Sequence, residues 1–165
     1  MKERNLLILG AGQFGQLVRE IAESTGDFAR IDFLDDQNPL AIGPLASYTE
    51  HCGEYGRAVV AIGNPQVRLA WLQKLQTAGY CLRPLVSPSA HASPSAVLGD
   101  GTVLEPMAVV QTAAVLGRGC IVSSGAVVRH NAVMDEGCHC DCNAVVLSCA
   151  RVPAYTKIPC GQCRE

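Results

Sequence analysis

The sequence predicts two parts: an α/β part containing a small parallel sheet, followed by an all-β part wound as a parallel solenoid. The solenoid is predicted by a six-residue period that runs without an insertion from Leu98 to Ile158. The α/β part is predicted by an apolar stretch, a glycine-rich turn and a helical pattern that ends at Gly26. We expect two domains, residues 1–84 and residues 85–165.

The composition is that of a globular protein and excludes several classes of partner. Of the 165 residues, 48% are hydrophobic and only 5% are aromatic, as expected for a core of stacked Ala, Val and Leu. The formal net charge is −2 and no Lys/Arg cluster is visible, so neither a nucleic acid nor a membrane surface is expected as a partner. The apolar runs are too short to span a bilayer and the first residues lack a signal peptide, which predicts a cytoplasmic protein.

Every sixth residue in the second half is large and apolar, and a small residue precedes each one by two positions. A strand repeats every two residues and a helix every 3.6, so a period of six indicates short strands joined by tight corners. We expect three hexads to close one coil of about eighteen residues, with about four coils stacked as parallel strands. The large positions are Leu98, Leu104, Val110, Leu116, Val122, Val128, Met134, Cys140, Val146, Val152 and Ile158. The small positions are Ala96, Thr102, Ala108, Ala114, Cys120, Ala126, Ala132, Cys138, Ala144, Ala150 and Thr156.

The nine cysteines are expected to be reduced thiols. Cys138, Cys140 and Cys142, with His139 among them, suggest a metal site, but C-x-C-x-C is not a usual zinc spacing. The hexad register places Cys138 and Cys140 in inward positions and turns His139 outward, so packing is favoured over zinc and no metal is expected. In the alternative metal interpretation, a further ligand would come from Cys149, Cys160 or Cys163.

The α/β part begins with a strand over residues 5–9, a glycine turn over residues 10–15 and a helix capped by Gly26. A second strand over residues 31–34 ends in Asp35 and Asp36. Glycines in such a turn let the backbone approach a phosphate at the helix N-terminus, and the acidic residue can accept hydrogen bonds from a ribose. In the alternative interpretation, the glycines only permit close packing and the aspartates only end a strand. The candidate binding residues here are Gly10, Gly12, Gln13, Phe14, Gly15, Asp35 and Asp36.

A loop-rich segment over residues 37–55 leads to a third strand over residues 57–62. Asn64 is then expected to cap a helix that has Pro65 in its first position and ends at Gly79, and Gly63 and Asn64 are further candidate binding residues. The buried face of this helix is predicted to contain Val67, Ala70, Trp71, Leu75 and Ala78. A fourth strand near residues 81–86 would complete the sheet, and residues 87–96 would cross into the solenoid. A sheet this small indicates a nucleotide or nucleotide-sugar ligand and not a complete dinucleotide.

The hexads resemble the left-handed β-helix of the hexapeptide acyltransferases. A small Rossmann-like domain that runs into such hexads resembles the sugar acyltransferases of the bacterial sialic-acid and bacillosamine pathways, which include sialic acid O-acetyltransferases. The matching segments are residues 7–15 (LILGAGQFG), 33–36 (FLDD), 61–64 (AIGN), 86–90 (VSPSA) and 124–131 (SGAVVRHN). The resemblance implies a homotrimer, an N-terminal domain that binds a nucleotide-linked amino sugar, and acetyl-CoA held between neighbouring β-helices.

Acetyl transfer needs a base for the acceptor's proton and donors for the oxyanion. The resemblance places the catalytic base at His130, which follows Val128 by two positions and is expected at an outward corner near Ser148. Ser123 and Ser148 are candidates for the acetyl-CoA side. The family's acidic neighbour of this histidine is replaced by Asn131, which can orient a ring but adds no charge, and its frequent asparagine is replaced by Ser123. By position alone, His130 could instead be a solvated corner histidine.

Two other functions remain open from the sequence. Pro159 and the segment 160–163 are expected to end the repeats, which would shorten the acyl-donor site or make it depend on a neighbouring subunit. A shortened solenoid could instead serve as a non-catalytic nucleotide-sugar-binding or trimerising scaffold. A zinc lyase on the same fold needs three histidine ligands, and His91, His130 and His139 do not share a register that would bring them together.

Overall fold

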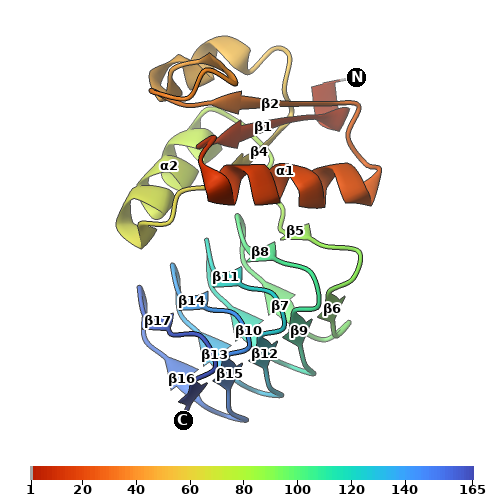
Figure 1. The fold of residues 1–165 in the computed structure, drawn as a ribbon, viewed down its shortest axis with the longest axis vertical. Helices are drawn as coiled ribbons and strands as arrows, with labels where there is room; N and C mark the ends of the chain where they lie inside the picture. The colour runs from red at the N-terminus through yellow and green to blue at the C-terminus, as the bar shows by residue number, and fades with distance from the viewer. Residues whose placement is uncertain (1) are drawn as a thin grey trace. The chain divides into compact units, whose positions relative to one another are not determined.

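The computed structural model describes residues 2–165 and divides the chain into two compact units, Met1–Arg83 and Pro84–Glu165 (Figure 1). The first unit contains a parallel sheet with strand order β3-β2-β1-β4. Its strands are β1 (Asn5–Leu9), β2 (Arg30–Leu34), β3 (Ala41–Gly43) and β4 (Arg57–Val60). Its helices are α1 (Gln13–Thr25) and α2 (Pro65–Thr77), with 3-10 helices η1 (Lys2–Arg4) and η2 (Leu45–His51). This is the Rossmann-like arrangement that the first half of the sequence predicts.

The two helices are positioned by the residues that the sequence pattern indicates at their ends. Gly26 ends α1 in the left-handed conformation, with φ 71°. Asn64 caps α2 by accepting the backbone N–H of Val67 at 3.1 Å. Strand β1 is buried along Leu6 to Leu9, as expected for a parallel strand covered on both faces.

Two predictions about the first unit were wrong. The buried face of α2 consists of Arg68, Leu72 and Leu75, whereas Val67 and Ala70 are exposed and Trp71 is half-buried. Buried Arg68 donates from Nη1 to the carbonyl oxygens of Ile62 and Gly63, both at 2.9 Å. These bonds satisfy the guanidinium group, so the side of α2 that contains Arg68 can face the interior although it is not the most apolar side.

The fourth strand of the sheet is also not the predicted one. Cys81 makes only an isolated parallel bridge to Arg57, and the fourth strand is β3, within the segment expected to be loop-rich. Strand β5 (Leu85–Val86) pairs with β8 in the second unit, so the solenoid already begins at Leu85.

The second unit is a prism with three faces, each a parallel sheet of two-residue strands (Figure 1). Partners are eighteen residues apart in each sheet, as in Val115↔Val133 and Val127↔Val145. One face contains β7 (Val97–Leu98), β10 (Val115–Leu116), β13 (Val133–Met134) and β16 (Arg151–Val152). A second contains β5, β8 (Val103–Leu104), β11 (Ile121–Val122), β14 (His139–Cys140) and β17 (Lys157–Ile158). The third contains β6 (His91–Ala92), β9 (Val109–Val110), β12 (Val127–Val128), β15 (Val145–Val146) and β18 (Cys163–Arg164).

The large and small positions of the hexads form the interior of the prism. The large positions from Leu104 to Ile158 are buried, and Cys138 and Cys140 are packed among them as predicted. Their columns lie on the flat faces and not at the corners. From residue 101 onward each corner contains one residue with positive φ, in a series of period six: Gly101, Met107, Ala113, Gly119, Gly125, Asn131, Gly137, Asn143, Cys149, Tyr155 and Gly161.

The predicted end of the repeats at Pro159 was wrong. Residues 159–162 form another corner, and β18 continues the third face by pairing with β15. Pro159 stands at the start of this corner, between β17 and β18, and does not interrupt the winding of the chain. None of the helices in residues 2–165 is long and apolar enough to cross a membrane.

Candidate functional site

His130 lies at an open groove of about 560 Å³ on the surface of the second unit. Strand β12 ends just before it, and the following corner turns the chain sharply at Asn131, which has φ 58°. The groove therefore combines a corner histidine with residues of the preceding coils. It is lined by His91, Ser93, Val109, Gln111, Thr112, His130 and Asn131.

Hydrogen bonds hold the His130 ring at both nitrogens. Nδ1 lies 3.1 Å from Asn131 Nδ2, and Nε2 lies 2.9 Å from the hydroxyl of Ser148. The backbone N–H of His130 donates to the side-chain oxygen of Gln111 at 3.1 Å. The structure thus brings together the predicted residues His130, Asn131 and Ser148, and it orients the ring of the exposed histidine.

The partner of Nδ1 determines which nitrogen can act as a base. If the Asn131 amide nitrogen donates to Nδ1, the ring proton lies on Nε2 and points at Ser148. If the amide is rotated by half a turn, its oxygen accepts from Nδ1–H and the Nε2 lone pair becomes available. Asn131 is compatible with either state, whereas a carboxylate would fix the proton on Nδ1.

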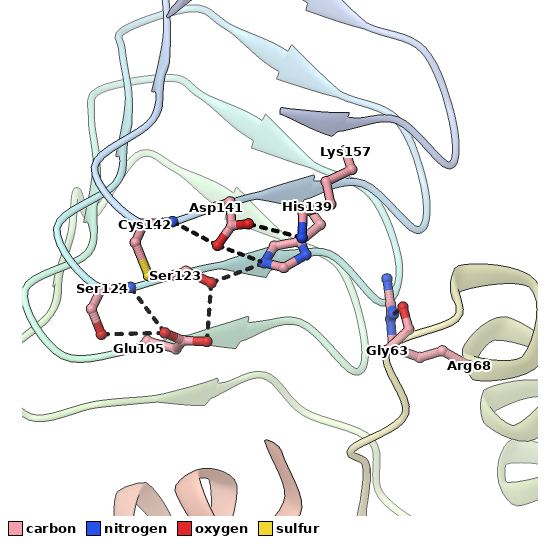
Figure 2. Close-up of polar contacts among 9 residues, drawn as sticks. All are labelled: Gly63, Arg68, Glu105, Ser123, Ser124, His139, Asp141, Cys142 and Lys157. Carbon is pink, nitrogen blue, oxygen red and sulfur yellow. Dashed lines mark hydrogen bonds and ion pairs between the residues drawn. The ribbon is translucent and has the colours of Figure 1, made fainter. Parts of the chain in front are cut away.

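Ser123 belongs to a different cluster, centred on the buried carboxylate of Glu105 (Figure 2). Glu105 accepts the hydroxyl of Ser123 at 3.1 Å, and it accepts the backbone N–H and hydroxyl of Ser124 at 2.9 and 3.2 Å. The Ser123 hydroxyl is also 2.9 Å from Nε2 of His139. Ser123 is buried, and its hydroxyl is engaged with Glu105 and His139.

Sequence analysis did not predict Glu105, and it predicted His139 only as an outward residue. Register could have found this cluster, because Glu105 and Ser123 are eighteen residues apart and occupy equivalent places in successive coils. His139 begins strand β14, next to the strand that precedes Ser123. The side chains of His91, His130 and His139 do not converge on a common point within residues 2–165.

The glycine turn of the first unit borders a second cavity of about 390 Å³, lined by Gly12, Asp35, Gln37, Asn38 and Pro39. The Asp35 carboxylate accepts the backbone N–H of Ala11 at 2.8 Å and those of Gln37 and Asn38 at 2.9 Å. These hydrogen bonds, above all the one from Ala11, hold the pKa of Asp35 below its usual value. Asp35 is therefore an ionised residue that organises the turn.

Several predicted binding residues have structural roles. Gly10 donates its N–H to Leu34, and a side chain on Gly15 would clash with the carbonyl oxygen of Gly10, so both glycines permit close packing. Asp36 accepts the N–H of Leu45, and Asn64 is a helix cap. The remaining predicted residues lie as follows: Gly12 at the cavity, Gln13 exposed and Phe14 half-buried at the start of α1, and Gly63 exposed with its carbonyl oxygen bound by Arg68.

A Rossmann-like unit followed by a hexapeptide prism with an oriented surface histidine defines a two-domain hexapeptide-repeat protein. Residues 5–75 match the PglD N-terminal domain, and residues 95–130 match the bacterial transferase hexapeptide family of six repeats. The solved acetyltransferase domain of PglB from Neisseria gonorrhoeae FA1090 is 31% identical, with a TM-score of 0.94 over 98% of this chain and 82% of that one. The same domain in complex with acetyl coenzyme A gives 32% identity and a TM-score of 0.94 with the same coverage. The chain belongs to the family of hexapeptide-repeat acetyltransferases that carry a PglD N-terminal domain.

Two further relatives extend the comparison. UDP-N-acetylbacillosamine N-acetyltransferase from Bacillus subtilis (strain 168) is 31% identical over 110 residues, which cover 61% of this chain. That match spans about half (51%) of the relative's length. PerB from Caulobacter crescentus, solved with CoA and GDP-perosamine, shares the fold, with a TM-score of 0.79 at 21% identity over 98% of this chain and 88% of that one.

Proposed function

We propose that the protein transfers an acetyl group from acetyl-CoA to an amino or hydroxyl group of a nucleotide-linked amino sugar. The main support is the 32% identity, over 98% of the chain, to an acetyltransferase domain solved with acetyl coenzyme A. The Bacillus subtilis relative, named for UDP-N-acetylbacillosamine, points to a UDP-linked amino sugar. These similarities do not favour a non-catalytic scaffold.

His130 acts as the general base in this proposal. Its ring proton is on Nδ1, and Nδ1–H donates a hydrogen bond to the amide oxygen of Asn131, with the amide rotated by half a turn. The acceptor amine takes the place of the Ser148 hydroxyl at Nε2, and its nitrogen attacks the thioester carbonyl carbon as Nε2 removes a proton. The tetrahedral oxyanion then collapses, the C–S bond breaks, and the CoA sulfur leaves with the proton held by His130. The products are the N-acetylated sugar and CoA.

Ser148 and Ser123 are proposed to have different roles on the acetyl-CoA side. The Ser148 hydroxyl, released from Nε2 by the acceptor, can donate to the developing oxyanion. Ser123 supports the site indirectly, because its hydroxyl connects Glu105 to the ring of His139. In this proposal only Ser148 contacts reacting atoms.

The first unit is proposed to bind the nucleotide at the cavity beside Gly12, where the first N–H groups of α1 have no partner within the helix. Gln13 and Phe14 begin the helix at this point. We also propose a homotrimer, in which the open groove around His130 is closed by a second copy of the chain. A cytoplasmic location, with the cysteines kept reduced, fits this function.

The test compares the turnover of His130→Ala with that of the wild type. Turnover is measured as the release of the CoA thiol from acetyl-CoA in the presence of a panel of UDP-linked amino sugars. Loss of a general base should lower kcat by about 10²- to 10⁴-fold without changing the unfolding temperature. His51→Gln is the control for loss of a histidine. His51 contacts the Tyr55 ring in the first unit and does not line the groove around His130. Unchanged turnover in His130→Ala would remove this residue from the mechanism. Failure of the wild type to bind acetyl-CoA at millimolar concentration, with nucleotide-sugar still bound, would favour the scaffold.

A further inference from the structure

A second group of reactive side chains lies at a corner where the last two coils of the prism meet. A carboxylate oxygen of Asp141 and the sulfur atoms of Cys142 and Cys160 lie within 4.8 Å of one another. Cys160 follows Cys142 by one coil, and the N–H of Gly161 donates to the Cys142 carbonyl oxygen at 3.0 Å. The stacking register therefore holds the two thiols side by side, although they are distant in the sequence.

This group differs from the cysteines that the sequence first suggested as metal ligands. Cys138 and Cys140 are fully buried in the core of the prism and cannot reach a surface ion. Cys142 is half-buried and Cys160 is exposed, so an ion could enter from solvent. Of the three cysteines in the C-x-C-x-C segment, only Cys142 is accessible, and it lies beside Cys160 of the next coil.

Polar side chains lie around Cys142, among them the carboxylate of Asp141 (Figure 2). Asp141 accepts the backbone N–H of Cys142 at 2.8 Å through Oδ1 and the ammonium group of Lys157 at 2.8 Å through Oδ2.

We propose that Asp141, Cys142 and Cys160 bind a zinc ion, with a water molecule as the fourth ligand. Zinc takes thiolate and carboxylate ligands in tetrahedral geometry, and thiolates favour it over magnesium or calcium. Binding breaks two S–H bonds, forms two Zn–S bonds and releases two protons to solvent, with no change of oxidation state. Zn²⁺ and the Lys157 ammonium group together balance the charge of two thiolates and one carboxylate.

The geometry needs only a small adjustment to accept the ion. Around a tetrahedral zinc ion, Zn–S bonds of about 2.3 Å place two sulfur atoms about 3.8 Å apart. The ligand atoms here are at most 4.8 Å apart, and rotation of the exposed Cys160 side chain can shorten this distance. Lys157 is mostly exposed, which lets its ammonium group move aside without leaving Asp141 unpaired. The ion would fasten the last coil to the one before it and stabilise the C-terminal end of the prism.

The experiment uses the full chain, purified without a histidine tag and treated with reductant and chelator. Titration with Co²⁺ should produce a thiolate-to-cobalt charge-transfer absorption that saturates at one ion per chain, and Zn²⁺ should displace it. Zinc should also release two protons per ion and raise the unfolding temperature. None of these readouts requires acetyl transfer, so their failure is distinguishable from failure of the proposed function.

Variants identify the ligands. Cys142→Ser and Cys160→Ser should each abolish the absorption and weaken zinc binding by more than about 100-fold, beyond the loss caused by removing an outer partner of a metal ligand. Cys149→Ser is the matched control, because Cys149 is an exposed cysteine at another corner. If a serine variant fails to fold, the alanine variant replaces it. No thiolate absorption in the reduced wild type, or an absorption that survives both substitutions, would overturn the proposal.

Discussion

Replacing Asn131 by aspartate puts a carboxylate next to Nδ1 of His130 with little disturbance of the corner. Asn131 has φ 58°, and aspartate is one of the few other L-residues that adopt this left-handed conformation readily. The Asn131 side chain already lies 3.1 Å from Nδ1. The carboxylate should therefore accept Nδ1–H, keep the Nε2 lone pair available and favour the protonated ring electrostatically.

The distance between the two side chains and their exposure to solvent determine how strongly the carboxylate stabilises the protonated ring of His130. Unit charges about 4 Å apart interact by about 1 kcal/mol in water and by about 4 kcal/mol at an effective dielectric constant of 20. Both side chains are exposed, so the lower value applies. Since 1.36 kcal/mol corresponds to one pH unit, the acid limb of the rate profile should move upward by about 0.7 pH unit.

The assay is kcat/KM for acetyl-CoA against pH, measured by thiol release at constant ionic strength. Asn131→Asp should move the acid limb to higher pH and raise the alkaline plateau, and added salt should reduce the shift. Asn143→Asp is the control, because Asn143 has φ 55° and the substitution makes the same change of charge at another corner. An acid limb that stays in place, or that moves equally in the control, would refute the role assigned to the His130–Asn131 pair.

Three further predictions concern stability. The Lys157 hydrogen bond lowers the pKa of Asp141 to about 2, below an unfolded value of about 3.9. The resulting stabilisation is present above about pH 4 and is lost as the pH falls from about 4 to about 2. In metal-free protein, the midpoint of urea unfolding should therefore fall less over this pH range in Asp141→Asn than in the wild type. Gly15→Ala should unfold the first unit by forcing a clash with a backbone oxygen, whereas Gly12→Ala, with no atom within 4 Å of the added carbon, should melt like the wild type by circular dichroism. Asn64→Ala removes the acceptor at the start of α2 and should lower the free energy of unfolding by about 1 kcal/mol in urea denaturation.

The prism could be predicted almost completely because its geometry repeats with the sequence. Each inward position needs a side chain that fits the same narrow interior, so the period of six translates directly into burial. Val128 and Val146 are both fully buried and lie eighteen residues apart, as the hexads predict. The β1–α1–β2 unit was equally predictable, because its strand, turn and helix signals are local.

The errors arose where tertiary contacts override a local pattern. Arg68 counts as polar in any apolar pattern, yet it is buried because two backbone carbonyl oxygens at the end of β4 accept its guanidinium group. Pro159 signals a break in most strands, but here it stands between two strands, β17 and β18, and the repeat continues beyond it. The three backbone N–H groups that bind the Asp35 carboxylate could not be predicted from the sequence, and the ribose-binding role expected of Asp35 stays a prediction.

The corners of the prism decide where its chemistry can occur. Inward positions must be apolar, and a corner is where an outward side chain can meet its counterpart from the next coil. His130 meets Ser148 in this way, and Cys142 meets Cys160, each pair being eighteen residues apart. A site at these corners therefore combines residues of successive coils, so a substitution at one corner also affects the residue eighteen positions away. Ser123 likewise pairs with Glu105, its counterpart one coil earlier.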